Sequence, residues 1–165
     1  MIGIFKLHNF SNKIYICVSA YKYWGNKVVE GSFKQPRVLL AEDDPTNQRV
    51  AMLMLKRLGY VANVVSNGRE AIQAIKRQKY DLVLMNIVMP EIDGLEATRE
   101  IRKLGYNNLK IIAITAYVFP GAKEMCIAAG MDDYIPKPVR INDLAEMLGK
   151  YQHDISGCQR MIPNH

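Results

Sequence analysis

The chain has 165 residues, of which 49% are hydrophobic and 23% are charged, so it can form one domain of ordinary size with a buried core and a short extra segment. Its net charge of +6 is concentrated at the N-terminus, because residues 1–36 hold five of the 22 basic residues and one of the 16 acidic residues. The remaining residues carry a balance of only +2. This argues against direct nucleic-acid binding, which needs clustered Lys and Arg.

Neither a membrane span nor a disulfide framework is indicated. No apolar run approaches the roughly 20 residues that cross a bilayer. The three cysteines, Cys17, Cys126 and Cys158, lie far apart without paired spacing. We therefore expect reduced thiols, a cytoplasmic location and no membrane partner.

Residues 1–36 differ in composition from the rest of the chain. They are rich in aromatic residues, with strand-like runs at 13–20 and 27–29 around the turn Trp24-Gly25-Asn26. A β-hairpin and the end of an upstream domain are both compatible with this pattern. We expect an N-terminal extension of unclear role that ends near Gln35-Pro36.

Strand-like and helix-like patterns alternate from residue 37 onward. The apolar strand-like runs cover residues 38–41, 61–65, 82–85, 111–114 and 133–135. Helices are predicted from Pro45, from the segment after Asn67, from Gly94 to about residue 104, over 122–129 and over 141–151. Residues 152–165 show no periodicity and form a C-terminal tail.

Three helix starts have a clear chemical signature. Asp44 precedes Pro45, which suits an N-cap followed by proline at the first helical position. Asn67 and Asp93 each precede a glutamate by three residues, which is the spacing of a capping box. In the first helix, an apolar stripe of Val50, Leu53, Met54 and Leu58 is expected to face the core.

Five strand–helix pairs in one segment predict an α/β fold. Parallel strands need crossover helices, and strands that are apolar with little alternation are buried on both faces. We therefore expect a doubly wound, five-stranded parallel sheet with five helices, over residues 37–151.

Polar side chains stand at the C-terminal ends of four predicted strands. They are Glu42 with Asp43, Asn86, Thr115 and Lys137. In an open α/β sheet these ends meet at one crevice. Two adjacent carboxylates attract a hard divalent cation such as Mg²⁺, and a lysine with a hydroxyl can bind a phosphoryl group. Taken singly, each of these residues could instead be a helix cap or a solvated surface group.

Residues 37–151 resemble a receiver domain of the two-component signalling family, which accepts a phosphoryl group from a phosphohistidine. The resemblance rests on Glu-Asp-Asp-Pro-Thr-Asn-Gln at 42–48, Met89-Pro90 with Asp93-Gly94, and two further segments, Ile-Thr-Ala at 114–116 and Asp-Asp-Tyr-Ile-Pro-Lys-Pro at 132–138. The sequence at 42–48 is most similar to that of receivers of hybrid histidine kinases. A flavodoxin-like fold is implied.

The resemblance also implies roles for individual residues. Glu42 and Asp43 correspond to the acidic pair that holds Mg²⁺, and the backbone carbonyl of Val88 to a further ligand. Thr115 and Lys137 match the groups that bind the phosphoryl oxygens. In addition, Tyr134 matches an aromatic residue that moves on activation, although it could equally be an edge aromatic that half covers the sheet.

Asn86 departs from the family pattern, which has Asp as phosphoacceptor and Mg²⁺ ligand at this position. A carboxamide is a poor nucleophile and carries no charge, although the carbonyl oxygen of Asn86 can still be a weak Mg²⁺ ligand. We therefore expect no ordinary aspartyl phosphate and weaker Mg²⁺ binding. A natural pseudo-receiver, a deliberately blocked receiver and a drifted fragment of a hybrid kinase all remain compatible with the sequence.

The implied partners are a histidine kinase or a histidine phosphotransfer domain. An effector or a second copy is expected at the face around Tyr134 and the last helix. Two other functions are weaker alternatives. A Mg²⁺-dependent phosphohydrolase would need a nucleophilic Asp at a strand end, and a DNA-binding response regulator would need a helix-turn-helix domain beyond residue 151. The leading expectation is a signalling domain and not an enzyme.

Overall fold

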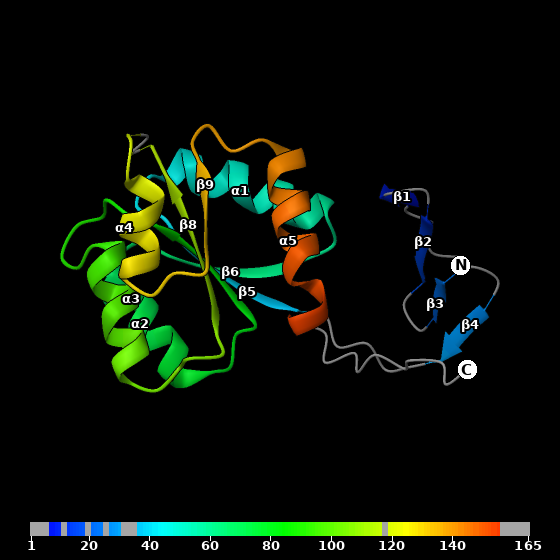
Figure 1. The fold of residues 1–165 in the computed structure, drawn as a ribbon, viewed down its shortest axis with the longest axis horizontal. Coiled ribbons are helices and arrows are strands. Elements are labelled where there is room, and N and C mark those ends of the chain that lie inside the picture. The colour runs from blue at the N-terminus through cyan, green and yellow to red at the C-terminus, as the bar shows by residue number, and fades with distance from the viewer. Residues whose placement is uncertain are drawn as a thin grey trace. The chain divides into compact units, whose positions relative to one another are not determined.

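A computed structural model describes the strands of residues 7–10, 13–18, 21–24 and 27–30, and the segments 36–116 and 119–155. The chain divides into two compact units, Met1–Lys34 and Gln35–His165 (Figure 1). In the part of the chain described, no helix is long and apolar enough to cross a membrane.

The first unit contains a four-stranded antiparallel sheet in the order β1-β2-β3-β4. The two runs expected to pair around Trp24 correspond to β2 and β4, but these strands do not pair with each other. A further strand, β3, lies between them in the sheet, pairing with β2 and with β4, the latter from Tyr21↔Glu30 to Trp24↔Lys27. Gly25 and Asn26 of the expected turn lie outside the described residues. The strands are β1 (Leu7–Phe10), β2 (Lys13–Val18), β3 (Tyr21–Trp24) and β4 (Lys27–Glu30).

The second unit is built on a five-stranded sheet in the order β6-β5-β7-β8-β9, in which every neighbouring pair is parallel. This confirms the predicted fold class. The strand order reverses at β5, since β6 lies on one side of it and β7 to β9 on the other. The strands are β5 (Arg37–Ala41), β6 (Val61–Val65), β7 (Leu82–Asn86), β8 (Lys110–Thr115) and β9 (Asp133–Pro136).

Five helices cover both faces of this sheet. Helices α1 and α5 lie on one face, and α2, α3 and α4 on the other (Figure 1). The helices are α1 (Pro45–Arg57), α2 (Gly68–Arg77), α3 (Gly94–Lys103), α4 (Ala122–Ala128) and α5 (Ile141–Ile155). Helix α5 therefore continues four residues past the expected end at Tyr151.

The two cores follow directly from the strand period of two. In β7, Val83 and Met85 belong to the core under α2, α3 and α4, whereas Leu82 and Leu84 belong to the core under α1 and α5. All four side chains are fully buried. Burial on both faces explains why the strand sequence shows no polar alternation.

The predicted helix starts are confirmed by their capping bonds. The side chains of Asp44, Asn67 and Asp93 accept hydrogen bonds from backbone N–H groups three residues later, at 2.8, 2.8 and 2.7 Å. Each bond satisfies one of the backbone donors that a helix leaves unpaired in its first turn.

The apolar stripe predicted for α1 was right at Met54 and Leu58, which pack against the core, but wrong at Val50 and Leu53. Val50 and Leu53 are 46% and 68% exposed, whereas Leu55 is fully buried. The face that packs on the sheet runs through Ala51, Leu55 and Leu58. Their spacing of four and three residues defines a helical face on the other side from Leu53.

Candidate functional site

The polar residues predicted at strand ends lie at one edge of the sheet. Glu42 and Asp43 follow β5, Asn86 ends β7, Thr115 ends β8, and Lys137 follows β9. These four strands are consecutive and parallel in the sheet, so their carboxyl ends point to the same edge. Contacts among Glu42, Asp43, Asn86 and Lys137 tie three of the four strand ends together.

Glu42 is paired with Lys137 across the site. Its side chain is buried, and the Lys137 ammonium group donates to both carboxylate oxygens at 2.7 and 3.0 Å. A buried carboxylate needs such compensation, because desolvation of an unpaired charge is costly. Lys137 also anchors β9 to β8, since its backbone N–H donates to the carbonyl of Thr115 at 2.7 Å.

Two side chains in the first turn of α1 hold Glu42 in place. These contacts were not predicted from the sequence. The Asn47 amide donates to a Glu42 carboxylate oxygen at 3.1 Å, and the Gln48 amide donates to the Glu42 backbone carbonyl at 2.7 Å. The predicted N-cap at Asp44 was a signal for these contacts, because it places Asn47 and Gln48 in the first turn of a helix that begins next to Glu42.

The Asn86 carboxamide nitrogen faces three oxygen atoms. It donates to the Asp43 carboxylate at 2.8 Å and to the Val88 carbonyl at 2.9 Å, and lies 3.5 Å from a Glu42 carboxylate oxygen. Only the NH₂ end of the amide fits here, because an amide oxygen in its place would meet acceptors alone. Asn86 itself is 6% exposed, whereas Asp43 lies open to solvent.

Gly94 fixes the backbone of Asn86. A Cβ at Gly94 would lie 2.1 Å from the Asn86 backbone carbonyl oxygen, a distance that no side chain can occupy. The Gly94 N–H also donates to the Ile87 carbonyl at 2.7 Å, which closes the turn between β7 and α3. The capping residue Asp93 and this glycine therefore act together to place the end of β7.

A second set of contacts holds the same turn against α2. Glu91 has a positive φ of 65° and accepts hydrogen bonds from Asn67 at 3.1 Å and from Arg69 at 2.9 Å. The Gly68 N–H donates to the Ile92 carbonyl at 3.0 Å. None of these three contacts was predicted, because they join the start of α2 to the loop between β7 and α3, two segments that lie far apart in the sequence.

The arrangement does not fit a bound Mg²⁺. Three of the predicted ligand positions (Glu42, Asp43 and the Val88 carbonyl) already face the Asn86 NH₂ group, which is a donor and repels a cation. Among the described residues, no three His, Cys, Asp or Glu side chains form a group that could hold a metal ion. With Lys137 included, the site carries one net negative charge.

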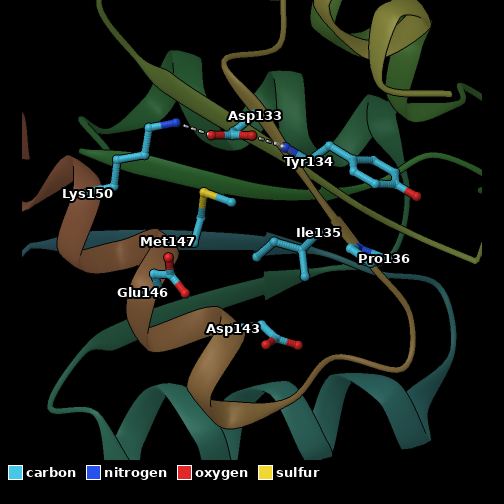
Figure 2. A pocket seen from close by; sticks show the side chains of 8 residues that line it. All are labelled: Asp133, Tyr134, Ile135, Pro136, Asp143, Glu146, Met147 and Lys150. Carbon is cyan, nitrogen blue, oxygen red and sulfur yellow. Dashed lines mark hydrogen bonds and ion pairs between the residues drawn. The ribbon is translucent and has the colours of Figure 1, made fainter. Parts of the chain in front are cut away.

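Tyr134 lies in β9, away from the strand ends. Its half-buried ring packs against the core under α2, α3 and α4. Figure 2 shows the ring on the opposite side of β9 from Asp133, which forms an ion pair with Lys150 of α5. A pocket between β9 and α5 is lined by Asp133, Tyr134, Ile135, Pro136, Asp143, Glu146, Met147 and Lys150.

Comparison with known proteins assigns the family. Residues 38–149 match the model of the response regulator receiver domain, so the chain belongs to the receiver domain family of two-component signalling. It is 38% identical over 152 residues to Probable histidine kinase 1 of Oryza sativa subsp. indica, and 37% identical over 122 residues to Hybrid signal transduction histidine kinase F of Dictyostelium discoideum. The alignments cover 73% and 71% of this chain but only 16% and 11% of those kinases.

Solved structures show the same flavodoxin-like fold. The receiver domain of sensor histidine kinase PA1611 from Pseudomonas aeruginosa PAO1, with a magnesium ion in its active site cleft, is 39% identical with a TM-score of 0.66, and the match covers 76% of this chain and all of that one. A co-crystal structure of the Saccharomyces cerevisiae phosphotransfer protein Ypd1 and the receiver domain of Ssk1 gives 25% identity and a TM-score of 0.67, covering 79% and 95% of the two chains.

Proposed function

We propose that this receiver domain acts as a pseudo-receiver, a signalling module that works by protein–protein contact without accepting a phosphoryl group. The observation that supports this most directly is the Asn86 amide at the acceptor position, with its nitrogen bonded to Asp43 and Val88. The amide is a poor nucleophile, and its NH₂ group faces the oxygens of Asp43 and Val88. Phosphoryl transfer to this position therefore lacks its attacking oxygen.

The other site residues fit a receiver that has lost only this step. We infer that Thr115 and Lys137 hold the phosphoryl-binding positions and that Glu42, Asp43 and the Val88 carbonyl hold the metal-binding positions. The Lys137 ammonium group donates hydrogen bonds to both carboxylate oxygens of Glu42. Its positive charge is therefore paired with an acid of the protein instead of being open to a phosphoryl group. We expect Mg²⁺ to bind more weakly than to a receiver with an aspartate at the acceptor position, which would add a further negative charge.

The proposed partners are a histidine kinase or a histidine phosphotransfer domain docking beside the strand ends. An effector or a second copy of the chain is proposed for the face formed by Tyr134 and α5. In this proposal Tyr134 and Thr115 mark a two-state equilibrium, and the packing of the protein itself sets the populated state. The same module would serve in this way within a longer hybrid kinase.

Intact-mass measurement after incubation with a small phosphodonor and Mg²⁺ tests the acceptor assignment. The wild-type chain should show no phosphoryl adduct, whereas Asn86→Asp should gain one adduct that is lost after base or hydroxylamine treatment. Asn107→Asp is the matched control, because it makes the same chemical change at an exposed residue and should gain none.

One result would contradict the pseudo-receiver role, and another would contradict the roles assigned to the other site residues. An adduct on the wild-type chain would show that another residue accepts the phosphoryl group. An Asn86→Asp variant that folds and still gains no adduct would show that the defect extends beyond the acceptor, so that the remaining site residues do not have the roles assigned here.

A further inference from the structure

We propose that the Asn86 amide blocks the acidic site at the strand ends, because its NH₂ group takes the place that a cation would hold among the oxygens of Glu42, Asp43 and Val88. This inference rests on the proposed function only in assigning the strand-end site, and it adds how that site is stabilised. We therefore expect Mg²⁺ to compete with the Asn86 NH₂ group for the same oxygens, instead of being bound by the Asn86 side chain.

The geometry of the hydrogen bonds carries the argument. An amide NH₂ has two hydrogens, and the two short contacts, 2.8 Å to Asp43 and 2.9 Å to the Val88 carbonyl, use both of them. The acceptors come from the end of β5 and from the turn after β7. A single neutral group thus joins the two segments whose oxygens face the pocket.

Groups of the protein itself pair with both acidic side chains, although one net negative charge remains. Lys137 neutralises Glu42 through two hydrogen bonds, and one amide hydrogen of Asn86 stabilises the Asp43 carboxylate by a charge-assisted hydrogen bond. In the described part of the chain, no buried side-chain nitrogen or oxygen lacks a hydrogen-bond partner. The site is therefore satisfied as it stands, and a cation would have to displace existing bonds.

Rotation of the amide does not provide an inexpensive route to a metal site. Turning its oxygen into the pocket breaks both short hydrogen bonds and brings a fourth oxygen among acceptors. The backbone of Asn86 has little room to shift toward α3, since even a Cβ at Gly94 would lie 2.1 Å from its carbonyl oxygen. A cation would have to recover the energy of both bonds before it gained any net binding.

Truncation of the side chain separates the two possibilities. If Asn86 were a Mg²⁺ ligand through its carbonyl oxygen, Asn86→Ala would weaken Mg²⁺ binding. If the amide blocks the pocket, Asn86→Ala should bind Mg²⁺ about tenfold more tightly than the wild-type chain, because the competing bonds to a charged group are gone. Calorimetric titration with Mg²⁺ alone measures this directly.

Thermal unfolding with and without Mg²⁺ is a second test of whether the amide blocks Mg²⁺ binding. The wild-type melting temperature should not change with millimolar Mg²⁺, whereas the Asn86→Ala variant should melt lower than wild type in EDTA and recover on addition of Mg²⁺. The double variant Asn86→Ala with Asp43→Asn should lose the response. Asn107→Ala is the control for an amide removed elsewhere and should behave like wild type.

Weaker or unchanged Mg²⁺ binding by Asn86→Ala would overturn the inference. If that variant does not fold, Asn86→Ser keeps a small polar side chain and the same opposing expectations apply. The phosphorylation test of Asn86→Asp is independent: that variant can gain its phosphoryl adduct whether or not the wild-type amide blocks the metal.

Discussion

Asparagine and aspartate at the acceptor position differ only in that an NH₂ group of the first is an oxygen in the second. The amide nitrogen needs acceptors around it, whereas a carboxylate oxygen needs donors or a cation. In Asn86→Asp, a carboxylate oxygen would face the Asp43 carboxylate and the Val88 carbonyl, the two groups to which the amide now donates. Like charges at such distances repel each other, and a cation is the usual remedy. The asparagine supplies its own donor, so the same backbone is compatible with a metal-free state.

Substitution of Gly94 should be among the most damaging changes near the site. A Cβ in Gly94→Ala would lie 2.1 Å from the Asn86 carbonyl oxygen and 2.9 Å from the Met85 side chain. Backbone atoms cannot yield as a flexible side chain can, so we expect the free energy of unfolding to fall by more than about 3 kcal/mol. Urea unfolding followed by circular dichroism measures the loss.

Gly149 is the matched control for Gly94. It lies in helix α5, where a Cβ would meet nothing within 4 Å. Gly149→Ala should therefore stabilise the protein by about 0.5–1 kcal/mol, since alanine is the better helix residue. If both alanine variants had similar stability, the contact at Gly94 would not be the constraint described here.

The secondary structure could be predicted from the sequence wherever the signal is local. The caps at Asp44, Asn67 and Asp93 need only residues three apart, and the strands are continuous apolar runs. The inward face of α1 was misjudged because the helix has apolar residues on more than one side. Val50 and Leu53 look like core residues in the sequence, and only the packing on the sheet selects Leu55.

The position of the site could be predicted from the sequence, but the contacts within it could not. Parallel strands bring their carboxyl ends together, so the meeting of Glu42, Asn86 and Lys137 follows from the fold class. The bonds between them do not follow. Glu42 and Lys137 are 95 residues apart, and whether that lysine pairs with an acid or stays open depends on distances that no spacing in the sequence encodes.

At the scale of elements, an ionic network joins β9 to α5 and should make stability depend on pH. Burial alone would raise the pKa of Asp133, but the ion pair with Lys150, the Tyr134 backbone N–H and the more distant Lys123 outweigh it and hold that pKa below the ordinary 3.8. A carboxylate with a lowered pKa stabilises the folded state above its unfolded pKa, and this stabilisation is lost as pH falls through the folded value.

Asp133→Asn isolates this contribution. At pH 7 the variant should be less stable than wild type by about 1.5–3 kcal/mol, the range for hydrogen bonds to charged groups. The difference should shrink as the pH is lowered from about 5 to below 3.8, because wild-type Asp133 becomes protonated there. Urea unfolding at several pH values measures it. A difference that stayed constant over this range would contradict the assignment of the pH dependence to Asp133.

At the scale of the whole molecule, the two units differ in charge, and the second unit contains a complete core. Residues 1–36 carry four of the six net positive charges. Both core clusters of the five-stranded sheet are built from residues between Val38 and Tyr151. Because these clusters cover the two faces of the sheet, the second unit has what it needs to fold by itself.

Deletion of Met1–Lys34 tests this independence. We expect the shortened chain to keep its cooperative unfolding transition, with a free energy of unfolding within about 0.5 kcal/mol of the corresponding transition in the full chain, the range for changes that disturb no packing. Denaturant unfolding and amide spectra of both chains provide the measurement. Spectra of residues 36–155 that change throughout, or a transition that is lost, would show that the first unit supports the receiver fold. The Mg²⁺ titrations of wild type and Asn86→Ala should then give the same order of affinities in the shortened chain, since the pocket groups named here all lie in the second unit.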